Sequence, residues 1–143
     1  MFRRLCLLSL MLLSLNVFAG PEPTRFGDLV VYHNVFNSTM LQPEIAASAG
    51  LKRGPTHGVI NVAVQRPDGS AVDAILKGEV RSLIGQPVAL DFNRIQEGDA
   101  IYFVANYTAT QRGVLLFKVD IQSAEGSMVH SLSFQQEFFP DDQ

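Results

Sequence analysis

Apolar and polar residues alternate along most of this chain, and a period of two residues is typical of β-strands with one buried face. One further segment instead combines aromatic and branched residues, which also favours a strand. The predicted strands cover residues 29–36, 60–65, 88–93, 101–108, 115–121 and 129–138. Connections between them are too short for helical crossovers, so the pattern predicts antiparallel sheets.

Turn residues separate these strands at the spacing of a sandwich or a small barrel. The clearest turn is Arg66-Pro67-Asp68-Gly69-Ser70, which should lead into a further strand near Ala71. Proline, alanines and a following glycine predict one short helix over residues 43–49. Asp99-Ala100-Ile101-Tyr102 is similar in outline to the tyrosine corner of immunoglobulin-like sandwiches, but its spacing is one residue short, and a tyrosine in an ordinary strand explains it as well. We therefore expect an all-β fold, a single immunoglobulin-like antiparallel β-sandwich of about 7–8 strands.

The first residues have the order of a secretory signal peptide. Arg3 and Arg4 are followed by an apolar run and then by Ala19, a small residue suited to cleavage. The run is shorter than the roughly 20 residues of a membrane-spanning helix, which makes an uncleaved anchor the weaker alternative. Cys6 lies too early for a lipoprotein signal. The expected domains are a cleaved signal peptide over 1–19 and one β-sandwich domain over 20–143.

The composition indicates which cellular compartment and which classes of partner fit this protein. Cys6 is the only cysteine, so the mature chain has no disulfide, which fits a bacterial periplasm better than an animal extracellular space. The net charge is −3, and the basic residues are scattered rather than gathered in a stripe. Nucleic-acid binding therefore has little support. We expect a periplasmic protein that does not bind a membrane after signal cleavage, as a monomer or a weak dimer.

Few residues suggest catalysis or metal binding. His33 and His130 lie inside predicted strands, where a histidine is usually part of a core or an interface. Met40, Met128 and His130 could form a copper(I) set of thioether and imidazole ligands, but three separate segments must then converge. The chain contains no Gly-x-Ser-x-Gly motif and no glycine-rich phosphate loop. We expect no enzymatic activity and no cofactor.

The end of the first predicted strand and the segment after the helix carry the best candidates for a recognition surface. These candidates are Asn34, Asn37, Ser38, Thr39, Arg53 and His57. A structural alternative is equally simple, because Asn, Ser and Thr at a strand end often form backbone-capping turns. The sequence leaves both roles open.

Several strings also resemble a family of exported gammaproteobacterial proteins that is catalogued only as a domain of unknown function. The matching strings are residues 32–39, 43–51, 59–64, 96–102 and 134–139. The resemblance implies a periplasmic, all-β, immunoglobulin-like domain, and it implies no mechanism.

Two functions fit these observations. The first is a non-enzymatic binding or adaptor domain that engages another envelope protein through a strand edge or a loop face. The alternative is a carrier of a small ligand or of a metal such as copper, with a pocket between the sheets or under the helix.

Overall fold

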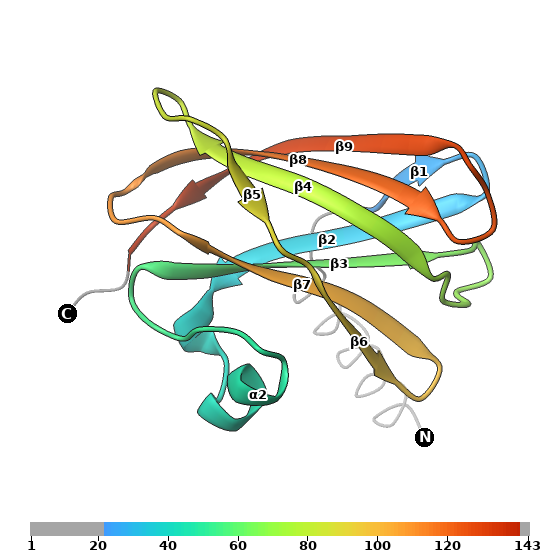
Figure 1. Cartoon of the computed structure of the whole chain (residues 1–143), viewed down its shortest axis with the longest axis horizontal. Coiled ribbons are helices and arrows are strands. Elements are labelled where there is room, and N and C mark those ends of the chain that lie inside the picture. The colour runs from blue at the N-terminus through green and yellow to red at the C-terminus, as the bar shows by residue number, and fades with distance from the viewer. Residues whose placement is uncertain (1–21, 141–143) are drawn as a thin grey trace, which may run out of the picture.

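Two antiparallel sheets form the protein (Figure 1). The computed structural model describes residues 22–140, so the expected signal peptide and Cys6 lie outside the described part. The strands are β1 Thr24–Phe26, β2 Leu29–Asn37, β3 His57–Gln65, β4 Ala74–Ser82, β5 Val88–Leu90, β6 Asn93–Glu97, β7 Ala100–Thr108, β8 Gly113–Ser123 and β9 Val129–Phe138. A 3₁₀ turn, η1 Ser38–Met40, and a helix, α2 Pro43–Ser48, separate β2 from β3.

The first sheet has the strand order β1-β2-β3-β7-β6, and the second has the order β5-β4-β8-β9. The predicted all-β sandwich is confirmed. The strand order is compatible with an immunoglobulin-like arrangement. In the first sheet, the order β2, β3, β7, β6 corresponds to strands A, B, E and D of that fold. In the second sheet, the order β4, β8, β9 corresponds to strands C, F and G. The predicted helix is confirmed and ends at Ser48, one residue earlier than expected.

The strand count exceeds the prediction, since residues 22–140 contain nine strands. The single strand predicted over 88–93 was wrong: the chain leaves the second sheet after Leu90 and enters the first sheet at Asn93 (Figure 1). Alternation continues across this step, because Leu90 is buried and Phe92 packs against the same core. A period of two residues does not reveal a change of sheet.

The core lies between the sheets and consists of the inward residues of each strand. Ile60, Val62 and Val64 of β3 face Phe117, Val119 and Ile121 of β8, and all are nearly inaccessible. Burying each such side chain contributes about 1.5–3 kcal/mol. No helix within residues 22–140 has the length and apolar character needed to cross a bilayer.

A glycine in β3 makes room for a core tyrosine. A Cβ atom at Gly58 would overlap the ring of Tyr107, its partner on β7. That ring makes edge contacts with Phe117, at 5.2 Å between centroids, and with Phe138, at 6.0 Å. Only glycine at position 58 therefore lets Tyr107 tie the two sheets together at this end.

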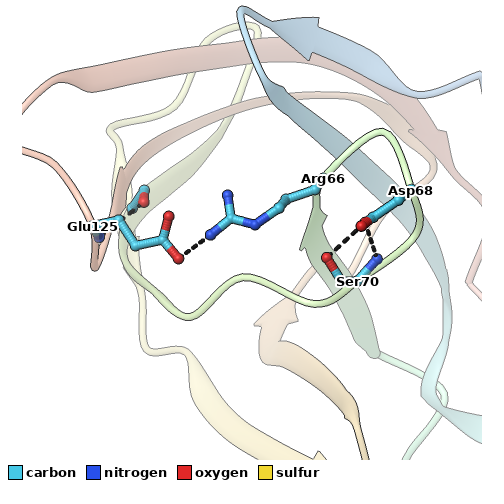
Figure 2. Close-up of polar contacts among 5 residues, drawn as sticks. Arg66, Asp68, Ser70 and Glu125 are labelled. Atoms are coloured by element: carbon cyan, nitrogen blue, oxygen red, sulfur yellow. Dashed lines mark hydrogen bonds and ion pairs between the residues drawn. The ribbon is translucent and has the colours of Figure 1, made fainter.

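The predicted turn at Arg66–Ser70 is confirmed and links the sheets at one end (Figure 2). Gly69 has φ 90°, a conformation that glycine adopts without strain. Asp68 Oδ1 accepts hydrogen bonds from the Ser70 backbone N–H at 2.9 Å and hydroxyl at 2.6 Å, which lowers the pKa of the Asp68 carboxyl. Arg66 forms an ion pair with Glu125 in the turn that joins β8 to β9.

Candidate functional site

Residues 38–54, which we call the cap, contain η1 and α2 and form most of the connection between β2 and β3. Three of the six recognition candidates lie at the base of this cap. The Ser38 hydroxyl is fully buried, donates to the Gly54 carbonyl and accepts from the Gly54 N–H, both at 3.0 Å. Arg53 donates from Nε to the Leu41 carbonyl at 2.8 Å and from Nη2 to the Thr39 carbonyl at 3.1 Å. These contacts close the base of the cap.

Two asparagines from the first sheet bind the stretch of the cap over residues 49–52. Asn93 of β6 donates to the Ala49 carbonyl at 3.0 Å. Asn106 of β7 accepts from the Lys52 N–H at 2.6 Å and donates to the Lys52 and Gly58 carbonyls at 3.0 and 3.1 Å. Neither residue was among the candidates predicted from the sequence, although asparagine is uncommon inside strands and its presence there was a usable signal.

The other recognition candidates do not join this group. Asn37 donates to the Phe139 carbonyl at 2.8 Å and so ties the end of β2 to the end of β9. His57 Nδ1 lies 3.4 Å from the Thr108 hydroxyl, and Asn34 lies opposite Asn61 of β3. The structure thus gives Ser38 and Arg53 the backbone-capping role that the sequence offered as an alternative. A recognition role for the six residues stays a prediction.

The copper candidates lie far apart. Met40 belongs to η1, which follows Asn37 and its contact with Phe139, whereas Met128 directly precedes the first residue of β9. Because a strand rises about 3.3 Å per residue, the ten residues of β9 separate these two ends by roughly 30 Å. Met40, Met128 and His130 therefore form no single ligand set. Within residues 22–140, no three His, Cys, Asp or Glu side chains gather around one possible ion.

One lateral side of the sandwich, which we call the open side, carries unprotected strand edges. β9 pairs with β8 on one side only, and no described strand pairs with its other edge. Its ten residues include no lysine, arginine or proline and only one charge, Glu137. In the first sheet, β1 covers only residues 29–31 of β2, because Pro23 precedes β1 and cannot donate to a ladder. Residues 32–36 of β2 thus lie beyond β1 and carry no formal charge.

Aromatic rings, together with the Asn37–Phe139 hydrogen bond, join the two sheets at the open side. His33 of β2 stacks on Phe134 of β9, with 4.1 Å between centroids, and Phe134 stacks on Phe117 at 5.0 Å. Phe26 of β1 stacks on His130 of β9 at 4.9 Å. Burial lowers the pKa of His33, and its Nδ1 has no hydrogen-bond partner within the described residues.

A hollow of about 320 Å³ lies at one end of the open side. Phe36 and Met40 line it from the first sheet and η1, and Phe138 and Phe139 line it from the end of β9. The Arg112 guanidinium lies 4.6 Å above the Phe139 ring, and Arg112 Nε lies 3.3 Å from the Glu137 carboxylate. A hollow with aromatic and polar walls, the latter from Asn37, Gln136 and Glu137, thus adjoins an unpaired strand edge.

Sequence comparison connects this architecture with a known family. The profile of DUF4426, described as a domain of unknown function, matches residues 23–141. The chain belongs to the DUF4426 family. A search of curated proteins finds no match.

Solved structures agree with this assignment. A DUF4426 protein from Pseudomonas aeruginosa PAO1 is 40% identical, with a TM-score of 0.78, and the match covers 87% of this chain and 99% of that one. FetP from uropathogenic Escherichia coli strain F11 is 11% identical, with a TM-score of 0.63 and coverage of 87% and 96%. A copper-bound variant of FetP is 10% identical, with a TM-score of 0.61 and coverage of 85% and 96%. At such identities the likeness to FetP shows a shared fold alone.

Proposed function

We propose that this DUF4426 protein is a periplasmic, non-enzymatic binding domain that adds an extended segment of another envelope protein to the edge of β9. The observation that carries the proposal is the open side. Along β9 an edge of ten residues is neither paired within the described chain nor guarded by lysine, arginine or proline.

Backbone chemistry explains why such an edge binds. Along an edge strand, alternate residues direct their N–H and C=O groups away from the sheet, and these groups pair with any extended chain that has the right register. Main-chain hydrogen bonds then supply affinity, whereas pockets for alternate side chains supply specificity. The hollow beside Phe36 and Phe138 is placed to receive one apolar side chain of the added segment.

The other features of the chain support a binding role in the envelope. The signal-like first nineteen residues favour export. The apolar face of β9 is already buried in the core, so an incoming strand would meet backbone and polar side chains. The preferred partner segment is therefore extended, free of proline at the paired positions, and carries one apolar residue near its end.

The experiment places a photo-reactive amino acid at Gln135 on β9 and, as a matched control, at Ala89 on β5. Both positions are exposed on edge strands of the second sheet. After cross-linking in the periplasm, we expect Gln135 to capture one envelope protein through a single extended segment, and Ala89 to capture none. Capture at Ala89 with equal yield, or no capture at Gln135, would contradict strand addition at β9.

Copper binding is the second candidate, because FetP, which shares this fold, has a copper-bound form. Met128 and His130 are two residues apart at the start of β9 and are the remaining members of the ligand set predicted from the sequence. Titration with Cu(I) and Cu(II) tests this candidate through the melting temperature and the metal retained after gel filtration. A stoichiometric copper signal that is lost in His130→Gln supports it, and no retained copper removes it.

A further inference from the structure

Tyr107 lines the hollow at the end of the open side and carries a hydroxyl group that the core does not use. The residue is only 6% exposed, and edge contacts with Phe117 and Phe138 hold its ring in place. Its hydroxyl makes no hydrogen bond to any described residue. A fixed ring with an unpaired hydroxyl is unusual, because buried tyrosine hydroxyls nearly always have a partner.

The register of the first sheet shows where this hydroxyl points. Gly58 of β3 lies opposite Tyr107 of β7 on one side and opposite Asn37 of β2 on the other. A Cβ atom at Gly58 would overlap the outer end of the Tyr107 ring, including its hydroxyl oxygen. The ring therefore crosses β3 from β7 toward β2, and its hydroxyl lies on the side where Asn37 lines the hollow.

The hydroxyl of Tyr107 is also open to that hollow. Within residues 22–140, the polar side-chain atoms that are both sealed from solvent and unpaired are His33 Nδ1 and Asn61 Oδ1. The unpaired Tyr107 hydroxyl is not among them, so a second molecule can reach it. Burial of the ring raises the pKa of Tyr107, so the hydroxyl stays protonated and can both donate and accept.

The walls of the hollow favour an uncharged aromatic ring with a polar tip. Phe36, Phe138 and Phe139 offer ring contacts. The two charges at the rim, Arg112 and Glu137, form an ion pair with each other, so neither requires a charged ligand. The volume of about 320 Å³ exceeds the roughly 150 Å³ of a protein cavity that accepts benzene, so a phenol ring fits.

We propose that the hollow receives a tyrosine side chain of the segment that pairs with β9, and that the hydroxyl of this tyrosine hydrogen-bonds to the hydroxyl of Tyr107. The inference rests on the proposed strand addition and names the residue that makes it specific. A phenylalanine would leave the Tyr107 hydroxyl unpaired, and a charged side chain would lose its hydration among aromatic walls.

Isolated side chains test the hollow without any partner, because p-cresol is the side chain of tyrosine and toluene is that of phenylalanine. In an NMR titration, p-cresol should shift the amide signals of Asn37 and Glu137, which line the hollow. It should bind about fivefold more tightly than toluene, which is the value of one net hydrogen bond. A hollow without a usable polar group would give the opposite order, because toluene is the less strongly hydrated molecule.

Two matched variants assign the preference to one atom. Tyr107→Phe removes only the unpaired hydroxyl, so it should keep the melting temperature and lose the preference for p-cresol. Tyr102→Phe makes the same change on the same strand at a residue that does not line this hollow, and it should keep the preference.

Cross-linking from Gln135 then connects the hollow with strand addition. The captured segment should contain a tyrosine within a few residues of the cross-linked position, and Tyr107→Phe should lower the yield about fivefold. A captured segment without tyrosine, equal binding of the two probes, or a preference that survives Tyr107→Phe would overturn this inference and leave strand addition standing. No capture at Gln135, with the p-cresol preference intact, would instead overturn strand addition and with it a tyrosine on an added strand.

Discussion

At one lateral side of the sandwich, the chain passes from β5 to β6 through Asp91 and Phe92 and so ties the two sheets together by covalent backbone. We call this the closed side. Its strands are short, Pro87 precedes β5, and β6 carries Arg94 and Glu97. At the open side no described backbone connects the sheet edges directly, and stacked rings hold β2 to β9.

The two sides differ in how well their edge strands are protected from pairing with other chains. Short strands, prolines and charges on an edge prevent other chains from pairing with it. The closed side uses all three devices, whereas β9 uses none over its ten residues apart from Glu137 near its end. The long unpaired edge of β9 supports the proposal that another chain pairs with it.

The largest expected effect comes from breaking the aromatic contacts of the open side. Phe134→Ala removes the ring that stacks on both His33 and Phe117, and it should lower the free energy of unfolding by about 3 kcal/mol. Phe92→Ala at the closed side should cost less, because backbone already joins the sheets there. Urea unfolding of both variants measures the difference, and a larger loss for Phe92→Ala would refute this account of the open side.

A charge placed on β9 should weaken partner binding without unfolding the domain. Gln135→Lys adds an edge lysine opposite Leu116 of β8, and it should lower partner capture at least tenfold while stability changes by no more than about 0.5 kcal/mol. Ala89→Lys on β5 is the matched control and should leave capture unchanged. Pull-down yield from the periplasm, measured beside the melting temperature, distinguishes the two. An equal loss of partner capture in both variants would mean that the added positive charge weakens binding wherever it lies on the surface.

The open side should also respond to mild acid through His33. Burial lowers the pKa of His33 from 6.5, so the unfolded chain binds a proton more readily than the folded one. Stability should therefore fall as the pH drops below about 6.5, the ordinary pKa of histidine, and should stop falling below the folded pKa. His33→Phe should remove this part of the pH dependence, and His57→Gln should keep it. Melting temperatures between pH 5 and 8 give the comparison.

The smallest effect is expected at the closed side, where Arg94 Nε lies 2.9 Å from Asp73 Oδ1. The hydrogen bond from Arg94 lowers the pKa of Asp73, so its contribution is present above the ordinary value of 3.8 and is lost as the pH falls through the folded value. Both side chains are about two-fifths exposed, so Asp73→Asn should cost under 1 kcal/mol, roughly the value of a surface pair. A loss that is unchanged at pH 3 would contradict an ionic origin.

Much of the fold could be predicted from the sequence, because alternation is a local signal of strands with one buried face. The boundaries of β2, β8 and β9 lie close to the predicted ones. β1 was missed because three residues are too few to show a period, and the step from β5 to β6 was missed because Leu90 on β5 and Phe92 in the link to β6 pack into the same core.

The candidate site was harder to predict, because its contacts join residues far apart in the chain. Ser38 and Arg53 were selected for a polar surface, yet they bind the backbone of their own cap. The partners of Asn93 and Asn106 lie 44 and 54 residues away, and the unsatisfied Oδ1 of Asn61 exists only in the assembled sheet. A pattern within a short stretch of sequence cannot show contacts between residues that are so far apart in the chain.

Amide hydrogen exchange on the complex with the captured envelope protein tests strand addition most directly. If a partner strand pairs with β9, alternate amides of β9, those directed away from β8, should exchange more slowly in the complex, while the amides of β5 and β6 should be unchanged. Protection that appears at β5, β6 or the cap and leaves β9 unaltered would contradict the proposal that this protein binds its partner through the edge of β9.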